Sequence, residues 1–290
     1  MRVGLHALGI GTGARPEVIR AVAVAAEAAG FATLWSGEHV VMVDRPVSRY
    51  PYSADGRIGI PAGEDWLDPL LGLTYAAAVT SRITLATGVL LLPEHNPLLA
   101  AKQAATLDVL SGGRFTLGIG VGWSAEEFAA LGVPFPRRGQ RAAEYVAAMR
   151  RLWSDDVASF DGEFTRFRAV RLNPKPVHGR RIPVVVGGNS DAALSRVAAF
   201  GDGWYGFNLS TAAAAERIAA LARHCQDHRR SLSELSVAVA LTDGDPSMLA
   251  DLARAGMTEL VVVAAPPADP AEAATWITGL ADRWNPTTGS

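Results

Sequence analysis

The feature that most constrains the fold is a pair of apolar segments joined by one helical segment. Residues 83–92 (ITLATGVLLL) have almost no polar interruption, as expected of a strand buried on both faces of a parallel sheet. Residues 114–119 form a second such strand. Asn96 and Pro97 suit the start of the helix between them, and the glycine pair at 112–113 suits its end. The stretch therefore predicts a right-handed β-α-β unit.

The helix of this unit is expected to pack on the sheet through a broad apolar face. Six residues at helical spacing would form that face. They are Leu98, Leu99, Ala101, Ala105, Leu107 and Leu110.

Glycines gather towards the C-terminal ends of both strands of the unit, at Gly88, Gly118, Gly120 and Gly122. Glycine weakens a strand, so it often marks a bulge or the close approach of a ligand. The alternative interpretation is tight packing of neighbouring helices on small residues.

Along the whole chain, about eight strands alternate with about eight helices. This order favours a closed (β/α)8 barrel, α/β in class and formed by one domain over residues 1–290. Longer excursions, residues 40–66 and 122–136, interrupt the pattern after the second and fourth strands. The rival is an open doubly-wound sheet. It is disfavoured because no glycine-rich turn with an acidic residue about 20 positions further on, as in a dinucleotide fold, follows the first strand.

Composition excludes several classes of protein. The chain has 290 residues, of which 49% are hydrophobic, and a formal charge of -2 gives no sign of a nucleic-acid surface. A single cysteine, Cys225, excludes an internal disulfide and fits a reducing compartment. No segment resembles a signal peptide or a membrane span, so a cytoplasmic protein is expected.

Three histidines, His6, His39 and His95, follow predicted strands and would converge on one mouth of the barrel. His39 is the strongest catalytic candidate because neutral imidazole can donate or accept a proton near pH 7. The alternative is a hydrogen bond to a backbone carbonyl. The preceding Glu38 is expected to pair with an arginine or to act in catalysis. Neither HExxH nor paired Cys/His spacing is present, so no metal site is predicted.

The sequence GGNS at residues 187–190 is the best anion-binding signal. It ends a strand and begins a helix, where free N–H groups and the helix dipole attract phosphate. Ordinary helix capping by Asn189 or Ser190 is the alternative.

The excursion 40–66 contains Tyr50, Tyr52 and Trp66. It could serve as a lid that excludes water from the mouth. A dimer contact or plain disorder are the alternatives.

Several motifs together resemble the bacterial luciferase-like monooxygenase family, in particular its branch that uses the deazaflavin coenzyme F420. They are WSGEHV, the long run RITLATGVLLLPEHNPLLAAKQAATLDVLSGGRFTLGIGVGW, and IPVVVGGNS followed by GDGW. The resemblance implies a (β/α)8 barrel that often dimerises and carries a flavin or deazaflavin across its C-terminal mouth.

The resemblance also implies roles for individual residues. A bulge in the third strand, typically with a non-prolyl cis peptide, would fall at Gly88-Val89 and support the cofactor ring. His39 would lie next to the reactive ring edge as the catalytic residue. The cofactor-binding residues implied in this way are His39, Thr87, Gly88, Val89, Gly118, Gly120, Gly187, Gly188, Asn189 and Ser190.

One departure from the family pattern bears on activity. Some deazaflavin dehydrogenases carry a glutamate just after the glycines of the fourth strand, where this chain has Val121. Glu126 and Glu127 follow a turn later and are expected to face solvent.

The resemblance implies an F420-dependent oxidoreductase that transfers a hydride to or from a small organic substrate, and a homodimer is expected. The runner-up is an FMN monooxygenase served by a separate reductase. A third hypothesis is a non-catalytic protein that binds the cofactor.

Overall fold

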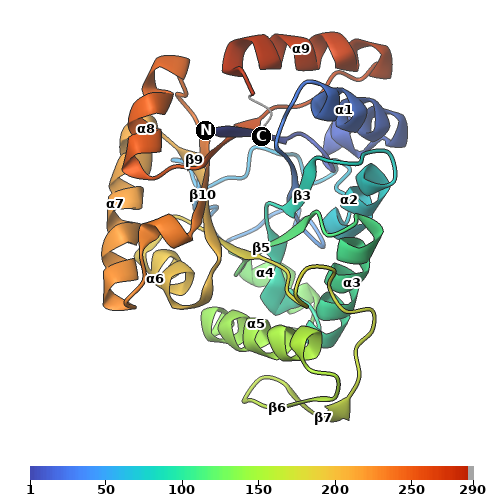
Figure 1. Ribbon diagram of the computed structural model, residues 1–290, viewed down its shortest axis with the longest axis vertical. Coiled ribbons are helices and arrows are strands. Elements are labelled where there is room, and N and C mark those ends of the chain that lie inside the picture. The colour runs from blue at the N-terminus through green and yellow to red at the C-terminus, as the bar shows by residue number, and fades with distance from the viewer. Residues whose placement is uncertain (287–290) are drawn as a thin grey trace.

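Eight parallel strands close into a barrel surrounded by helices in the computed structural model, which describes residues 1–286 (Figure 1). Neighbouring strands pair in parallel around the circle, β3 pairs with β5, and β11 pairs with β1. The barrel strands are β1 (Arg2–His6), β2 (Thr33–Ser36), β3 (Thr84–Thr87), β5 (Phe115–Gly120), β8 (Val184–Gly187), β9 (Gly203–Leu209), β10 (Ser236–Leu241) and β11 (Glu259–Val263). The predicted (β/α)8 barrel is confirmed, and the open sheet is excluded.

An outer layer of helices follows the strands. Its members are α1 (Pro16–Ala28), α2 (Pro69–Ala77), α3 (Pro97–Leu110), α5 (Arg138–Ser154), α6 (Asp191–Phe200), α7 (Thr211–Asp227), α8 (Leu249–Ala255) and α9 (Ala273–Trp284). Local sequence fixes several starts. Asp68 accepts a hydrogen bond from the Leu71 N–H and Asn96 from the Leu98 N–H, each followed by proline at the first helical position.

The third barrel strand is divided in two. After β3, the peptide bond between Gly88 and Val89 is cis, and the short β4 (Leu90–Leu91) continues the strand. The Gly88 N–H donates to the Ser36 carbonyl at 2.7 Å, so the bulge is tied to β2. The cis peptide lies where the resemblance implied it.

The apolar face expected for α3 is only partly right. Ala101, Ala105 and Leu107 are buried. Leu99 and Leu110, however, are 64% and 61% exposed. The helix packs inward mainly through a stripe of alanines, which allow close approach to the strands, so the two leucines point outward.

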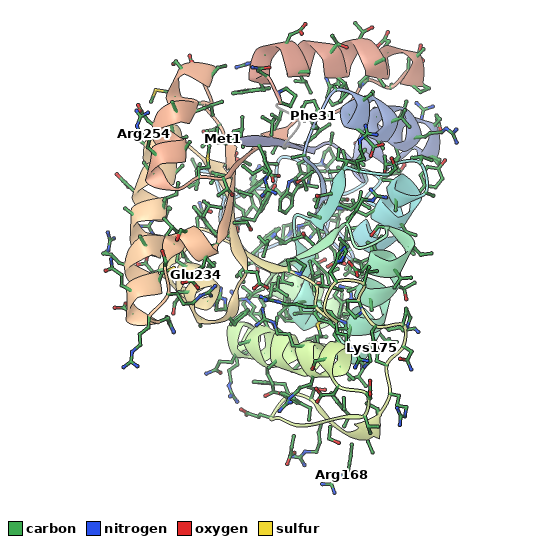
Figure 2. All side chains as sticks on the ribbon, viewed as in Figure 1. Met1, Phe31, Arg168, Lys175, Glu234 and Arg254 are labelled. Atoms are coloured by element: carbon green, nitrogen blue, oxygen red, sulfur yellow. The ribbon has the colours of Figure 1, made fainter. Side chains whose placement is uncertain are left out.

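The two excursions lie at the C-terminal end of the barrel. Residues 40–66 have little regular structure, and the loop after β5 contains the short helix α4 (Ala125–Ala130). The antiparallel hairpin of β6 (Ala158–Asp161) and β7 (Arg166–Val170) follows α5. Its Arg168 points into solvent, away from the barrel (Figure 2).

Candidate functional site

A cavity of about 810 Å³ opens among the loops at the C-terminal ends of the strands. Its lining comes from segments that are distant in sequence. They are residues 6–10, 37–39, 49–60, 88–91, 120–123, 187–190 and 263–266, with side chains from α5, α6 and β9. Parallel strands of a barrel present their C-terminal ends at one face, which explains the convergence.

His39 lies at one side of this cavity, shortly after β2, and is hydrogen-bonded to Glu127. His39 Nδ1 is 2.7 Å from Glu127 Oε2, and only 6% of the histidine side chain is exposed. Glu127 Oε1 also accepts the N–H groups of Val40 and Val41. An ionised carboxylate can only accept, so this network assigns the Nδ1 proton to His39 and leaves Nε2 as an acceptor.

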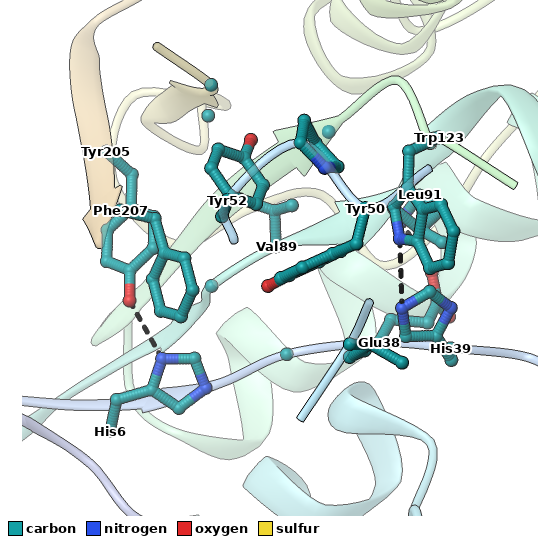
Figure 3. Close-up of a pocket in the computed structure, with 18 of the residues that line it drawn as sticks. His6, Glu38, His39, Tyr50, Tyr52, Val89, Leu91, Trp123, Tyr205 and Phe207 are labelled. Atoms are coloured by element: carbon teal, nitrogen blue, oxygen red, sulfur yellow. Dashed lines mark hydrogen bonds between the residues drawn. The ribbon is translucent and has the colours of Figure 1, made fainter. Parts of the chain in front are cut away.

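Aromatic rings hold the His39 imidazole in place. Trp66 and Trp123 meet it edge-on, with ring centroids 4.9 and 5.7 Å away. The indole N–H of Trp123 donates to His39 Nε2 at 3.4 Å, a long contact that a polar ligand could replace (Figure 3). The free nitrogen of His39 is therefore the one available for proton transfer.

The expectation that Glu127 faces solvent is wrong, because its side chain is 1% exposed. Helix α4 directs it under the loop that begins at Val40, where three hydrogen-bond donors converge on it. Local sequence does not reveal this role, because it depends on the segment at Val40 and Val41 folding back over α4. Ser124 does cap α4, but the Glu127 carboxylate serves the loop instead.

One interpretation predicted an ion pair between Glu38 and an arginine, but within residues 1–286 Glu38 has no such partner. Its carboxylate accepts the Leu91 N–H at 2.6 Å and lies 3.0 Å from Nε2 of His95. Glu38 is buried and fixes the strand segment that follows the cis peptide. His6 and His39 both line the cavity, whereas His95 is bonded to Glu38 and is not among the lining residues of the described chain.

His6 lies on the floor of the cavity at the end of β1. Its Nδ1 is 2.8 Å from the Tyr205 hydroxyl (Figure 3). Burial lowers the pKa of His6 to about 4 and raises that of Tyr205. Both groups are therefore neutral at pH 7, which makes this part of the floor polar but uncharged.

The turn 187–190 forms the opposite wall. Ser190 caps α6 by accepting a hydrogen bond from the Ala193 N–H. The side-chain amide of Asn189 donates to the Phe207 carbonyl and accepts from the Phe207 N–H. The capping interpretation is therefore right for Ser190. Both residues still line the cavity, together with Gly187 and Gly188.

The cavity is also lined by Arg138 and Arg196, beside this turn. Neither arginine was selected from the sequence. Arg196 Nε is buried and has no hydrogen-bond partner within residues 1–286. Burial and the nearby charge of Arg138 lower the pKa of Arg196. Arg196 follows the turn by two helical turns, and long side chains point back towards the helix N-terminus, so its position was a usable signal.

Thr87 and Gly118, which the resemblance implied as cofactor contacts, are not among the residues that line the cavity in the described part of the chain. The Thr87 hydroxyl donates to the Gly118 carbonyl at 2.6 Å. A Cβ at Gly118 would lie 1.8 Å from the Thr87 carbonyl oxygen, so only glycine fits there. These residues join β3 to β5 behind the cavity wall. Gly88, Val89 and Gly120 do line the cavity.

The loop 40–66 covers part of the mouth. Figure 3 shows the rings of Tyr50 and Tyr52 in the cavity, between Phe207 and His39 in this view. Tyr50 meets Trp123 at 5.3 Å and Tyr52 meets Phe207 at 5.5 Å, so the aromatic residues form a continuous wall. Glu126 of α4 accepts the N–H groups of Val47 and Ser48 and fastens the loop.

Within residues 1–286, no group of three or more His, Cys, Asp and Glu side chains is arranged to hold a metal ion. The same residues contain no helix with the length and apolarity needed to cross a bilayer.

Comparison with known proteins identifies a matching family model and several individual relatives. The model of the family described as luciferase-like monooxygenase matches residues 3–243. An uncharacterized protein of Mycobacterium tuberculosis strain H37Rv is 41% identical over 185 residues, which are 63% of this chain and 65% of that protein. The chain thus matches slightly less than two thirds of that relative's length.

Two further matches are more distant. The FMNH2-dependent dimethylsulfone monooxygenase of Pseudomonas putida is 36% identical over 131 residues, which are 44% of this chain and 36% of that enzyme. The structure of the coenzyme F420-dependent tetrahydromethanopterin reductase of Methanopyrus kandleri superposes with a TM-score of 0.74 at 18% identity. That superposition covers 96% of this chain and 97% of the reductase.

Proposed function

Because the chain belongs to the luciferase-like monooxygenase family, we propose that it is an F420-dependent oxidoreductase acting on a small organic substrate. When bound, the deazaflavin ring would supply or accept the hydride. The observation that carries the proposal is that one cavity is bounded by His39, by the cis peptide at Gly88-Val89 and by the turn 187–190.

The residues present fit a flat cofactor with an anionic tail. Gly88 and Val89 line the cavity, and the absence of a side chain at Gly88 lets the rings of Trp35, His6 and Tyr205 pack within 3.2–3.4 Å of where its Cβ would lie. At the turn 187–190, the buried unpaired Nε of Arg196 is a donor that lacks an acceptor, and a phosphate would provide one. Arg138 would add a second positive charge beside it.

In this proposal His39 moves the proton that accompanies hydride transfer. Its Nε2 faces the cavity as an acceptor, while Glu127 holds the proton on Nδ1 and fixes the ring orientation. Trp66 and Trp123 restrict rotation of the imidazole. The tyrosines of the loop 40–66 would exclude water from the reacting groups.

FMN is the alternative cofactor, and the FMNH2-dependent relative from Pseudomonas putida supports keeping it. The turn and the cis peptide suit either ring, and with FMN a separate reductase would have to supply the reduced form. Titration of the protein with each cofactor, oxidised and reduced, distinguishes the two. We expect micromolar binding of F420 and weaker binding of FMN. Tighter binding of FMN would overturn the choice of F420, and binding of neither would overturn the whole proposal.

Replacing Arg196 tests where the anionic tail binds. A charge-assisted hydrogen bond contributes about 1.5–3 kcal/mol, so Arg196→Ala should raise the Kd of the cofactor by about ten- to a hundredfold. The matched control is Arg217→Ala, because Arg217 pairs with Asp191 on the surface. Equal effects of the two substitutions would contradict a tail site at Arg196.

Replacing His39 separates a catalyst from a protein that only binds the cofactor. General acid–base residues typically contribute about 10²–10⁴ in rate, so His39→Gln should lower kcat by that factor with little change in cofactor Kd. His224→Gln, on the outer helix α7, is the control. If the wild-type protein binds cofactor but turns over no carbonyl or alcohol substrate, the non-catalytic hypothesis replaces this one.

We also propose that residues 1–290 act as one barrel domain, that two copies form a homodimer, and that the protein is cytoplasmic. The dimer is supported by exposed apolar side chains on α2 and α3, among them Leu71 and Leu99.

A further inference from the structure

The histidine on the cavity floor has one ring nitrogen held by the protein and one that is free. His6 Nδ1 is 2.8 Å from the Tyr205 hydroxyl (Figure 3). Within residues 1–286, His6 Nε2 makes no hydrogen bond, and it is not among the unpaired side-chain atoms that are closed off from solvent. Because His6 lines the cavity, this second nitrogen is open to a ligand there.

The buried tyrosine decides which nitrogen of His6 carries the proton. Burial raises the pKa of Tyr205 well above its usual value, so the phenol keeps its proton. Its hydroxyl has no partner other than His6 in the described chain, and a buried O–H that donated to nothing would be destabilising. Tyr205 therefore donates to Nδ1, and a neutral imidazole that accepts at Nδ1 carries its proton on Nε2. Since burial lowers the pKa of His6 to about 4, the ring is neutral at pH 7 and offers an N–H donor to the cavity.

The interior of the barrel fixes the direction of this donor. The indole of Trp35 stacks on Tyr205 with 4.7 Å between the ring centroids. Trp35 Nε1 in turn donates to Glu259 Oε1 at 2.8 Å. His6 also packs so closely on Gly88 that a Cβ added there would be 3.4 Å from Cε1 of the imidazole. The donor is thus held in place before a ligand arrives, which lowers the entropic cost of binding one.

The wall around His6 is apolar. Among residues 1–286, the lining contributed by β1, β11 and the loops after them has one polar side chain, that of His6, and is otherwise formed by Ala7, Leu8, Ile10, Val263, Ala264, Ala265 and Pro266. Thr12 joins the two loops, because its hydroxyl donates to the Pro266 carbonyl. In the circle of eight strands β8 is four strands away from β1, so the turn 187–190 lies across the cavity. A ligand against β1 and β11 therefore meets one uncharged donor in apolar surroundings.

We propose that His6 binds the substrate, and that the substrate is an apolar molecule with a carbonyl or hydroxyl oxygen that accepts a hydrogen bond from Nε2. This inference rests on the proposed function, in which the anionic tail of the cofactor lies across the cavity at the turn 187–190. The apolar part of the substrate packs against the loops after β1 and β11. A neutral imidazole suits a carbonyl oxygen, because it stabilises negative charge there without adding a net charge to the site.

The first test reads the tautomer of His6 and needs no cofactor. In protein labelled with 15N-histidine, two-bond 1H–15N correlation spectra distinguish the two neutral tautomers, and His6→Gln assigns the signal. We expect the neutral Nε2–H form at pH 7, and a change in the His6 signals in Tyr205→Phe, which removes the donor to Nδ1. Tyr75→Phe, at an exposed position on α2, is the matched control and should leave the spectrum unchanged. An Nδ1–H tautomer or a charged ring in the wild type overturns the proposal.

The second test compares two probes of the same shape, cyclohexanone and methylenecyclohexane, at millimolar concentration. The wild type should bind cyclohexanone about five- to tenfold more tightly, because only the ketone accepts a hydrogen bond, and the ketone alone should shift the Nε2–H resonance of His6. His6→Leu should bind the two probes equally, whereas His6→Gln, which keeps an N–H donor, should recover part of the preference.

The wild-type comparison decides the matter even if His6→Leu does not fold. Equal affinity of the wild type for the two probes, or no binding of cyclohexanone, overturns the proposal. Since the probes are used without cofactor, these results stand even if the titrations above reject F420 and FMN.

In the loaded enzyme the proposal predicts which constant changes. His6→Leu should lower kcat/KM for a ketone by about 10²-fold, the loss seen when one donor to a developing oxyanion is removed, and leave the Kd of the cofactor near wild type. His228→Leu, at the exposed end of α7, is the control. A rise in the cofactor Kd with unchanged kcat/KM would mean that His6 binds a carbonyl of the cofactor ring, and would overturn its assignment to the substrate.

Discussion

At the residue scale, His6 links the cavity floor to stability. Its ring is buried beside Tyr205, and burial lowers its pKa from 6.5 to about 4. Between these values the unfolded chain binds a proton at this position that the folded protein does not bind. Stability is therefore complete above pH 6.5 and is lost as the pH falls towards 4, by up to about 3 kcal/mol.

Urea unfolding at pH 7, 6 and 5 checks this prediction. The wild type should lose stability on acidification more steeply than His6→Gln, which cannot titrate. His228→Gln, at the exposed end of α7, is the control and should follow the wild type. Parallel curves for wild type and His6→Gln would show that His6 is protonated in the folded state.

The site residues differ in whether local sequence reveals their roles. His39 and Gly88 could be selected from sequence, because each follows or interrupts a recognisable strand. Glu127 could not, because its role depends on the loop that begins at Val40 folding back over α4. Glu94 was equally hidden, since no local pattern reveals that both of its carboxyl oxygens are buried without a hydrogen-bond partner within residues 1–286.

At the element scale, the strands and helices followed from local rules, whereas the excursions did not. Asp68 and Asn96 mark helix starts because a side-chain oxygen must satisfy free backbone N–H groups there. The loop 40–66 has no such periodic signal. Its path is set by tertiary contacts, such as the Trp66 indole N–H that donates to the Gly37 carbonyl.

The same loop gives a prediction about Glu126. This carboxylate accepts the N–H groups of Val47 and Ser48, and hydrogen bonds from Ser48 lower its pKa to about 2, so it stays charged at physiological pH. Glu126→Ala should release the loop and let trypsin cleave after Arg49 or Arg57 faster than in the wild type. Initial cleavage rates by mass spectrometry measure this.

Global stability should change little, by roughly 0.5 kcal/mol, because the substitution lies at the surface. The matched control is Glu163→Ala, which removes an exposed carboxylate from the β6–β7 hairpin and should leave cleavage in the loop unchanged. Equal cleavage rates in Glu126→Ala and wild type would mean that other contacts hold the loop.

At the scale of the whole molecule, the outer faces of α2 and α3 carry exposed leucines that we propose as the contact between two copies of the chain. Leu71 is 68% exposed on α2, and Leu99 and Leu110 are exposed on the adjacent α3 (Figure 1). Contiguous exposed apolar side chains usually mark an interaction surface. Pairing of two copies through this face would remove these leucines from water and account for the positions where the predicted inward face of α3 was wrong.

The double substitution Leu71→Glu with Leu99→Glu should therefore dissociate the proposed dimer. Two buried carboxylates in each copy would face an apolar partner surface, and an unpaired buried charge costs several kcal/mol. Light scattering after size exclusion should give one chain mass for this variant and two for the wild type. Val24→Glu on α1, another exposed apolar position, should remain dimeric. Because these leucines lie on the outer helices, away from the residues that line the cavity, monomers should still bind the cofactor; loss of binding on dissociation would instead mean that pairing shapes the cavity.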